Sequence, residues 1–461
     1  MKKCRIFFIS LILVFATLPF TSVNAAYNSI LTDLEPRSGI ILVQSMEDGT
    51  VIFDKNSHQR TPPASLTKIV TAILTLENCP DLSAMVTVPQ SVLDSLANTG
   101  SSNAGLKAGE EISVLDLLHC MLIPSANEAA ATLADYISGG HIDGFVDKMN
   151  VFVERLGCTD THFMTPHGLD TEGQYTTAAD MAKIMKYALT FSQSEIFENI
   201  VSLVSYELPA SNMHEEPRII RNTNFLMNTG YSDYYCKYVT GGKTGSTSGA
   251  GKCVVATASS SGYAYMAVIM NAPHDDIDGD GWDENGAFTD AKMLFEWMFK
   301  NIRYESILSS AEVTAEVKVR LSSKTDHLAL VPAEDLFAFV PTGVGENSVL
   351  VKVVDGTLPE RVDAPIHKGD KIAEAAVYYA DQEIARTDLV AAEDVSRNLF
   401  LFLGSVLADI FTHPVVLVIL GLLALLALAY IGFVLYVRRK DKKIRKALNN
   451  KSKVVQMKDY Q

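Results

Sequence analysis

The sequence predicts an α+β protein: an antiparallel sheet flanked by helices, then a small all-β domain and one C-terminal transmembrane helix. Residues 26–303 begin with a hairpin pattern, continue with helical patterns, and end with three strand patterns and a last helix. This order is typical of helices packed around an antiparallel sheet. Residues 304–395 consist of short strand patterns separated by turn residues. Residues 415–437 carry no charged side chain, and a run of that length can cross a bilayer.

The first 25 residues have the pattern of a secretory signal peptide. A positive n-region with Lys2, Lys3 and Arg5 is followed by an apolar stretch and by a small-residue cleavage site at residues 23–25. We therefore expect residues 1–25 to be removed after export. A retained N-terminal anchor is the alternative.

The strand patterns come in two groups. Near the mature N-terminus, apolar runs at 38–46 and 50–56 are separated by Glu47-Asp48-Gly49, and Asp-Gly between such runs is a hairpin signal. The later group has short loops rich in Gly and Ser, as in an antiparallel meander. Its strand patterns lie within 235–245, 252–260 and 262–272.

Helical patterns fill the region between these groups. Apolar side chains recur at helical spacing over 66–77 and predict a buried helix. Ser113 and Asp116 resemble a capping box that opens a short helix ending near Pro124. Further helices are predicted over 125–137, 144–156, 177–189 and 287–303.

The C-terminal part indicates a single-pass membrane anchor. Residues 396–413 are apolar with few charges and are expected to lie at the membrane surface as an amphipathic segment. The expected span is 414–437, and the excess of Lys and Arg in residues 438–461 places that tail in the cytoplasm. The bulk of the chain is then extracytoplasmic and tethered to the cell membrane.

Charge and cysteine content narrow the class of protein further. The net charge is −15 although the signal and the tail are both basic, so the exported part is strongly acidic, which argues against nucleic acid as a partner. No C-x-x-C pair exists, so neither a zinc site nor a dense disulfide framework is indicated. Buried thiols are the preferred interpretation, with one or two bridges as the alternative. The mature cysteines are Cys79, Cys120, Cys158, Cys236 and Cys253.

Ser65 and Lys68 stand three residues apart at the start of the predicted helix over 66–77. Positions with that spacing share a helix face, so Ser65 Oγ and Lys68 Nζ can meet. A serine hydroxyl becomes a good nucleophile when a base takes its proton, and lysine can act as that base only where its charged form is disfavoured, as by burial at a helix N-terminus. The alternative is that Ser65 caps the helix and Lys68 is an exposed charge.

A second motif, Ser125-Ala126-Asn127, follows directly after Pro124. A hydroxyl held on a loop can relay protons, and an amide can bind a substrate amide. The alternative is helix capping, since Ser and Asn are both favoured N-cap residues.

A third motif lies in residues 240–251, TGGKTGSTSGAG, where Lys243-Thr244-Gly245 follows a strand pattern among glycines. Small residues there let a substrate backbone pair alongside the strand, while Lys243 offers charge to a carboxylate. The alternative is a flexible hairpin turn.

The order S-x-x-K, S-x-N, K-T-G is that of penicillin-binding proteins and serine β-lactamases, and the chain resembles that superfamily. It resembles more closely the low-molecular-mass penicillin-binding proteins that are serine-type D-alanyl-D-alanine carboxypeptidases. The resemblance covers roughly residues 27–395 and includes that family's C-terminal β domain, in which LVAAEDV is typical. It rests on the blocks PPASLTKIVTA, PSANEAA, HGLDTEGQYTTAADMA and GGKTGSTSGAG.

The resemblance implies a penicillin-binding fold for residues 26–303 and a role for each motif. Ser65 would attack the carbonyl of the penultimate D-alanine of a peptidoglycan stem peptide, with Lys68 as general base. Ser125 would pass the proton to the leaving D-alanine, and water would release the acyl-enzyme. β-Lactam antibiotics would mimic the substrate and acylate Ser65.

The resemblance also implies how substrate would be held. The amide of Asn127 would hold the substrate, and the terminal carboxylate would face Lys243 and Thr244. Backbone N–H groups of Ser65 and Ser246 would form the oxyanion hole. The implied substrate-binding set is Asn127, Lys243, Thr244, Gly245 and Ser246. No metal or organic cofactor is implied.

Several alternatives are weaker. Residues 275–286 resemble a calcium loop, but Ala287 stands where an EF-hand needs a bidentate Glu, which favours an acidic surface loop. The ten histidines show no metal-ligand spacing, and His162 and His167 are expected to be structural. A D,D-endopeptidase would use the same residues, whereas a serine β-lactamase would need a deacylating carboxylate that the sequence does not identify. A non-catalytic wall-binding scaffold would not need complete motifs.

Overall fold

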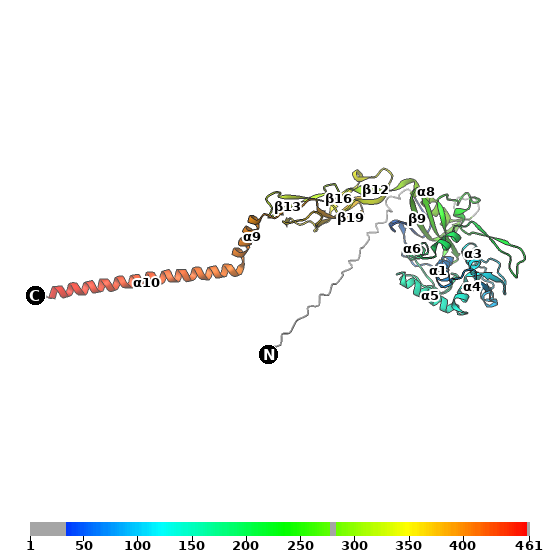
Figure 1. Ribbon diagram of the computed structural model, residues 1–461, viewed down its shortest axis with the longest axis horizontal. Helices are drawn as coiled ribbons and strands as arrows, with labels where there is room; N and C mark the ends of the chain where they lie inside the picture. Colours follow the sequence, from blue (N-terminus) through cyan, green and yellow to red (C-terminus); the bar gives the residue numbers. More distant parts are fainter. Residues whose placement is uncertain (1–33, 277–282, 459–461) are drawn as a thin grey trace, which may run out of the picture. The chain divides into compact units, whose positions relative to one another are not determined.

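The computed structural model describes residues 34–276 and 283–458, with side chains described up to residue 446. The predicted signal peptide, residues 1–25, lies outside the described residues, as does the middle of the candidate calcium loop. Two compact units are distinguished in Figure 1. The first comprises the described residues up to Ile307 with Leu336–Leu350 and Val377–Ala385, and the second comprises Leu308–Asp335, Val351–Ala376 and the chain from Arg386.

The first unit is built on a five-stranded sheet in the order β2-β1-β9-β8-β7, with antiparallel neighbours throughout. The predicted hairpin is confirmed, because Val43 pairs with Phe53 and Gly49 takes a φ of +80° in the turn between them. The N-terminal hairpin and the three late strands therefore share one sheet, and β7 lies at its edge. The strands are β1 (Ile40–Ser45), β2 (Val51–Lys55), β7 (Val239–Thr247), β8 (Gly251–Ser260) and β9 (Tyr263–Ala272).

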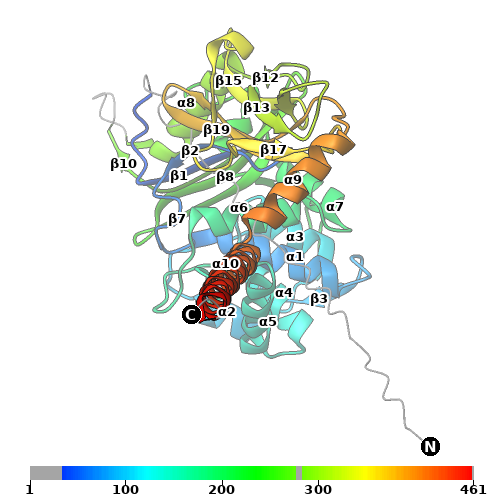
Figure 2. The same ribbon diagram turned by 90° about the vertical axis from the view of Figure 1, so that its left-hand side faces the viewer.

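Alternating side chains of β9 enter two different cores, as the period of a strand dictates. Met266 and Val268 pack with the large helical layer that contains α1 and α6, whereas Ala267 and Ile269 pack with α8 (Gly286–Asn301). Figures 1 and 2 show this sandwich, with α8 on one face of the sheet and α1 and α6 on the opposite face. Both faces of the sheet are therefore buried, and the edge strand β7 is the part of the sheet that can contact other segments of the chain.

The helical layer contains the predicted helices in the predicted order, together with two helices that were not predicted, α2 (Gln90–Leu96) and α7 (Ser194–Val201). The N-terminal half of the predicted capping box is confirmed, because Ser113 Oγ accepts a hydrogen bond from the Asp116 N–H at 3.0 Å. The predicted helix over 66–77 begins differently: a 3₁₀ turn, η1 (Ala64–Thr67), precedes the α-helix. The helices are α1 (Lys68–Asn78), α2 (Gln90–Leu96), α3 (Val114–Leu122), α4 (Asn127–Ser138), α5 (Ile142–Arg155), α6 (Ala178–Ala188) and α7 (Ser194–Val201).

Several short elements of the first unit have no counterpart in the sequence-based expectation. They are small two-stranded ribbons and one further 3₁₀ turn, and they connect the larger elements. These are β3 (Met85–Thr87) with β4 (Glu111–Ser113), β5 (Ser205–Leu208) with β6 (Arg218–Arg221), β10 (His274–Asp275) with β11 (Glu284–Asn285), β12 (Ile302–Leu308) with β15 (Leu336–Pro341), and η2 (Phe225–Met227). In the described part of the chain the five mature cysteines are buried and free, as the preferred interpretation had it.

The second unit is dominated by a six-stranded sheet in the order β16-β18-β19-β14-β13-β17. Its core is formed by small and branched apolar side chains such as Leu328, Leu330 and Leu389. The prediction of a small all-β domain after the catalytic region is confirmed. The strands of this sheet are β13 (Ala315–Arg320), β14 (His327–Pro332), β16 (Leu350–Val353), β17 (Arg361–Asp363), β18 (Lys371–Tyr379) and β19 (Gln382–Ala391), whereas the 3₁₀ turn η3 (Glu346–Ser348) belongs to the first unit.

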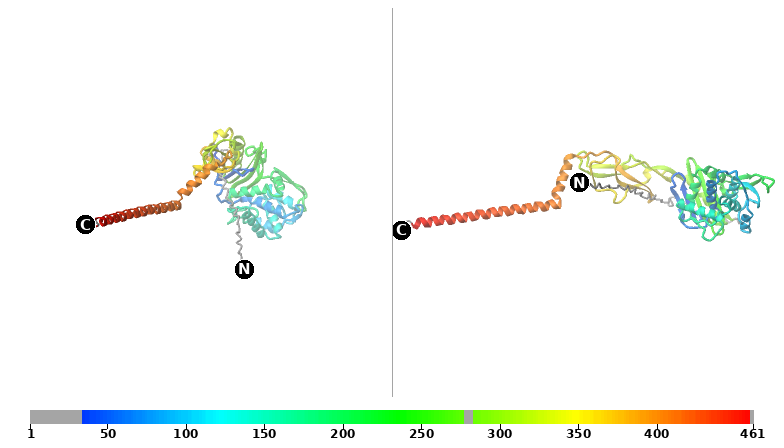
Figure 3. Two further views of the ribbon diagram at one scale, coloured as in Figure 1. Left: turned by 60° about the vertical axis from the view of Figure 1, so that its left-hand side comes forward. Right: turned by 60° about the horizontal axis from the view of Figure 1, so that its bottom comes forward.

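Two helices end the chain, α9 (Leu399–Thr412) and α10 (Pro414–Lys458). Residues Pro414–Lys446 of α10 are long and apolar enough to cross a membrane, and their apolar side chains are exposed along the helix shown in Figure 3. This agrees with the expected span over 414–437. The α+β fold with one C-terminal membrane-spanning candidate is therefore confirmed, while the limits 304–395 and 396–413 stay predictions.

Candidate active site

Ser65 lies on the 3₁₀ turn η1, and Lys68 is the first residue of α1. Residues three apart eclipse one another in a 3₁₀ turn, so their side chains point the same way. Lys68 Nζ is 2.8 Å from Ser65 Oγ. The sequence predicted this contact from α-helical spacing, and the tighter turn makes the alignment closer.

Lys68 is completely buried, so the alternative of an exposed surface charge is wrong. Its Nζ has three hydrogen-bond partners, all oxygens: Ser65 Oγ, Asn127 Oδ1 at 2.6 Å and the backbone carbonyl of His167 at 2.7 Å. Burial holds the pKa of Lys68 well below its usual value, and the positive charge of Lys243 lowers it further, against a smaller opposing effect of Glu128. The site therefore favours an uncharged amine next to the Ser65 hydroxyl.

The loop before α4 presents Ser125 to the other lysine. Lys243 Nζ donates hydrogen bonds to Ser125 Oγ at 2.9 Å and to the Thr244 carbonyl at 2.8 Å. The capping alternative for Ser125 is wrong, because Ala126 is the N-cap of α4 and Ser125 has a φ of +65° outside the helix. Burial lowers the pKa of Lys243 to about 7. Ser125 thus connects the start of α4 to the edge strand β7.

Strand β7 lies close to η1 because Gly245 has no side chain. A Cβ added at Gly245 would come within 3.0 Å of Ala64 Cβ and 3.2 Å of the Ser65 backbone nitrogen. The next residue, Ser246, is exposed and pairs with Lys252 across the ladder. Thr244 Oγ1 lies 2.5 Å from Thr223 Oγ1. The structure therefore joins the three motifs around Ser65, from one edge strand and the ends of two helices.

The 165–168 loop contributes to this site in a way that the sequence did not predict. His167 contributes its backbone carbonyl to Lys68, and the Thr71 hydroxyl donates to the Pro166 carbonyl at 2.6 Å. Burial, and secondarily the charge of Lys68, lowers the pKa of the His167 ring to about 3, so the ring is neutral. The block HGLDTEGQYTTAADMA marked this region, but nothing in it indicated a backbone contact to Lys68.

Gly168 holds that loop against η1, and its replacement by alanine is expected to destabilise the fold by about 3 kcal/mol. Its φ is +89°, and an added Cβ would lie 1.9 Å from the Ala64 carbonyl oxygen. Gly262 is a matched control, because its φ is +87° but nothing lies within 4 Å of an added Cβ. Gly262→Ala should cost only the backbone strain of about 1 kcal/mol. Urea midpoints of the two variants measure the difference, and equal losses would contradict the packing argument.

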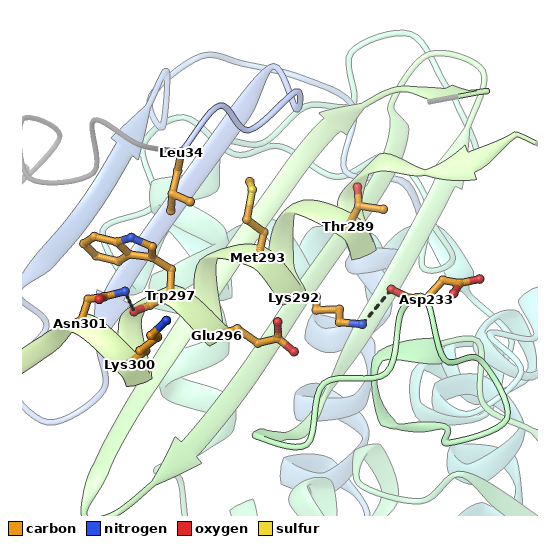
Figure 4. A pocket seen from close by; sticks show the side chains of 9 residues that line it. All are labelled: Leu34, Asp233, Thr289, Lys292, Met293, Glu296, Trp297, Lys300 and Asn301. Atoms are coloured by element: carbon orange, nitrogen blue, oxygen red, sulfur yellow. Dashed lines mark hydrogen bonds between the residues drawn. The ribbon is translucent and has the colours of Figure 1, made fainter. Parts of the chain in front are cut away.

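Among the described residues, no group of three or more His, Cys, Asp or Glu side chains could hold a metal ion. A separate cavity of about 460 Å³ lies along α8 and shares no residue with the predicted site, as Figure 4 shows. It is lined by Leu34, Asp233, Thr289, Lys292, Met293, Glu296, Trp297, Lys300 and Asn301.

Known proteins are similar to this chain over most of its length. A family model described as D-alanyl-D-alanine carboxypeptidase, peptidase family S11, matches residues 28–274, and one described as penicillin-binding protein 5, C-terminal domain, matches residues 304–397. The D-alanyl-D-alanine carboxypeptidase DacD of Salmonella typhimurium is 30% identical over 383 residues, covering 82% of this chain and 90% of that protein. DacF of Bacillus subtilis is 28% identical over 400 residues, covering 87% and 96%.

Solved structures give the same result. Penicillin binding protein 5 from Haemophilus influenzae is 26% identical, with a TM-score of 0.55, and the match covers 79% of this chain and 99% of that one. The Streptomyces K15 DD-transpeptidase is 25% identical, with a TM-score of 0.51 over 58% of this chain and 98% of that one. The first match extends beyond the catalytic region, whereas the second covers a shorter part of the chain.

Proposed function

The chain belongs to the D-alanyl-D-alanine carboxypeptidase family, a family of serine peptidases that act on peptidoglycan, and we propose that Ser65 is its nucleophile. The substrate is then a stem peptide ending in D-Ala-D-Ala, from which the enzyme removes the last residue. The observation that carries the proposal is the buried Lys68 amine at 2.8 Å from Ser65 Oγ.

An uncharged Lys68 amine has two N–H groups and one lone pair. Its three hydrogen-bond partners can therefore each interact with one of these groups. The two N–H groups donate to Asn127 Oδ1 and to the His167 carbonyl, both of which can only accept. The lone pair is left for the Ser65 hydroxyl proton. Lys68 is therefore oriented as a general base, with its lone pair held on the nucleophile.

Acylation then proceeds in balanced steps. Ser65 Oγ forms a bond to the carbonyl carbon of the penultimate D-alanine while its proton moves to Lys68. Backbone N–H groups of Ser65 and Ser246 receive the negative oxygen. The C–N bond breaks, and the leaving amine takes the proton held by Lys68, relayed through Ser125, so that Lys68 is again neutral. A water molecule, which gives its proton to Lys68 as Ser65 did in acylation, then attacks the ester carbonyl. The ester is hydrolysed and Ser65 is restored.

Lys243 and Thr244 contribute to substrate binding in different ways, Lys243 through its charge and Thr244 through direct contact. Lys243 is only 1% exposed, so it acts on a terminal carboxylate mainly through its electric field. The half-buried Thr244 hydroxyl is the group placed for direct contact. A β-lactam carries a carboxylate and a reactive amide in a similar relation, and we expect such antibiotics to acylate Ser65 as inhibitors.

The long apolar helix α10 supports a membrane-anchored enzyme. We propose that residues 1–25 are removed on export, that residues 414–437 span the membrane, and that the basic tail 438–461 remains in the cytoplasm. The catalytic domain, residues 26–303, then works outside the cytoplasm, with residues 304–395 between it and the membrane-proximal segment 396–413.

Detergent-solubilised full-length protein tests the proposal directly. With diacetyl-L-Lys-D-Ala-D-Ala it should release free D-alanine. Benzylpenicillin should add one acyl group, which peptide mapping by mass spectrometry should place on Ser65. Absence of D-alanine, or an adduct on another residue, would contradict the assignment.

A further inference from the structure

The segment Asn222–Asn224, between β6 and η2, connects the two halves of the active site. The Thr223 N–H donates to the Ile123 carbonyl at 3.2 Å, and Ile123 directly precedes the loop that carries Ser125. The Thr223 side chain contacts the opposite half, since its Oγ1 lies 2.5 Å from Thr244 Oγ1 on β7. One residue therefore connects the Ser125 loop to the strand that receives the substrate carboxylate.

Two buried asparagines keep Thr223 in this position. Asn222 Oδ1 accepts from the Asn224 N–H at 2.8 Å, and Asn222 Nδ2 donates to the Leu203 carbonyl at 2.7 Å. Asn224 Oδ1 in turn accepts from the Leu226 N–H at 3.2 Å. Side chains whose neighbours are fixed in this way lose little entropy when they hold a ligand contact in place.

The hydrogen bond between Thr223 Oγ1 and Thr244 Oγ1 can run in either direction, but only one direction allows Thr244 to donate to an anionic substrate. Thr244 has a single hydroxyl hydrogen, and an ionised carboxylate can only accept. If Thr244 donated to Thr223, it would present only lone pairs to the carboxylate, which is repulsive. If Thr223 donates instead, the Thr244 hydrogen is free to point at the substrate.

We propose that Thr223 is a positioning residue that donates its hydroxyl hydrogen to Thr244 and so directs the Thr244 hydroxyl at the terminal carboxylate of the substrate. The inference rests on the proposed function, in which Thr244 faces that carboxylate. It makes Thr223 a determinant of specificity for substrates with a free C-terminus. Thr223 itself touches no reacting atom in this proposal.

A pair of activated thioesters separates positioning from general stability. Both carry the diacetyl-L-Lys-D-Ala acyl group; one has mercaptoacetate as its leaving group, and the other has the uncharged methyl ester of mercaptoacetate. For Thr223→Val we expect kcat/KM on the mercaptoacetate substrate to fall about fivefold, mainly through KM, as for a lost hydrogen bond between uncharged groups. The methyl ester should react at the wild-type rate within about twofold, which is the ordinary effect of a remote change.

Two further variants complete the experiment. Thr223→Ser keeps the hydroxyl and should restore the wild-type KM. Thr257→Val removes one hydroxyl from a second threonine pair on the same sheet, Thr240 Oγ1 with Thr257 Oγ1 at 2.8 Å, and should change neither substrate's kinetics. Should Thr223→Val fail to fold, Thr223→Ala removes the same hydroxyl in a smaller side chain.

The possible outcomes distinguish the role of Thr223 from the proposed function of the enzyme. Equal losses on both thioesters, or no loss on either, would overturn the role of Thr223 while leaving the proposed function intact. Failure of Thr223→Ser to restore KM would do the same. A folded wild-type enzyme that cleaves neither thioester would overturn the proposed function and this inference with it.

Discussion

Ser65→Ala is expected to abolish D-alanine release and covalent labelling by benzylpenicillin. Among the three hydrogen-bond partners of Lys68 Nζ, only Ser65 supplies a hydroxyl, so no other oxygen can take over as nucleophile. Loss of a serine nucleophile lowers kcat by about 10⁶-fold in serine proteases, and we expect a loss of that order here. D-alanine release and the mass of the intact protein after labelling measure both effects.

Ser259→Ala is the matched control for this variant. Ser259 is exposed on β8, and its replacement should leave release and labelling at the wild-type level. The Ser65→Ala protein should also melt close to the wild type, because one hydroxyl oxygen of a partly exposed residue has been removed without adding volume. Persistent labelling of Ser65→Ala would show that the nucleophile is elsewhere.

Lys68→Met is expected to slow acylation of Ser65 by about 10²- to 10⁴-fold, the usual contribution of a positioned general base. Methionine fills a similar volume without an amine, so the buried space remains occupied. The rate of benzylpenicillin acylation, followed under single-turnover conditions, is the measurement. A loss of less than tenfold would contradict the role of Lys68.

The pH profile checks the same assignment. Burial disfavours the ammonium form of Lys68 and holds its pKa well below the usual value, so the neutral base is present at a lower pH than for an exposed lysine. As the pH falls through that lowered pKa, Lys68 takes up a proton and wild-type acylation should decline. The residual acylation of Lys68→Met should lack this acid limb. An unchanged limb would assign the titration to another group.

Local signals in the sequence predicted most of the fold. The Asp48-Gly49 turn and the Ser113 cap each act through bonds to residues only a few positions away, and both are present as expected. The order of strands and helices, with the sheet between two apolar cores, followed from periodicity. The S-x-x-K spacing predicted Ser65 and Lys68 as neighbours because that contact spans only one turn.

The rest of the site depends on contacts between distant parts of the chain. Asn127 and His167 reach Lys68 across sequence separations of 59 and 99 residues, and spacing cannot reveal such pairs. The His167 contact uses a backbone carbonyl, which has no side-chain signature. Thr223 was not recognised either, since a threonine in a polar loop carries no pattern until β7 is placed beside it.

The position of β7 at the end of the five-stranded sheet has a consequence for solubility. An open sheet edge is a template on which other polypeptides can add a strand, and proteins normally guard such edges against aggregation. Here glycines at 241, 242 and 245 weaken the strand propensity of the edge. An edge of this composition disfavours self-association while it stays open to a short peptide ligand.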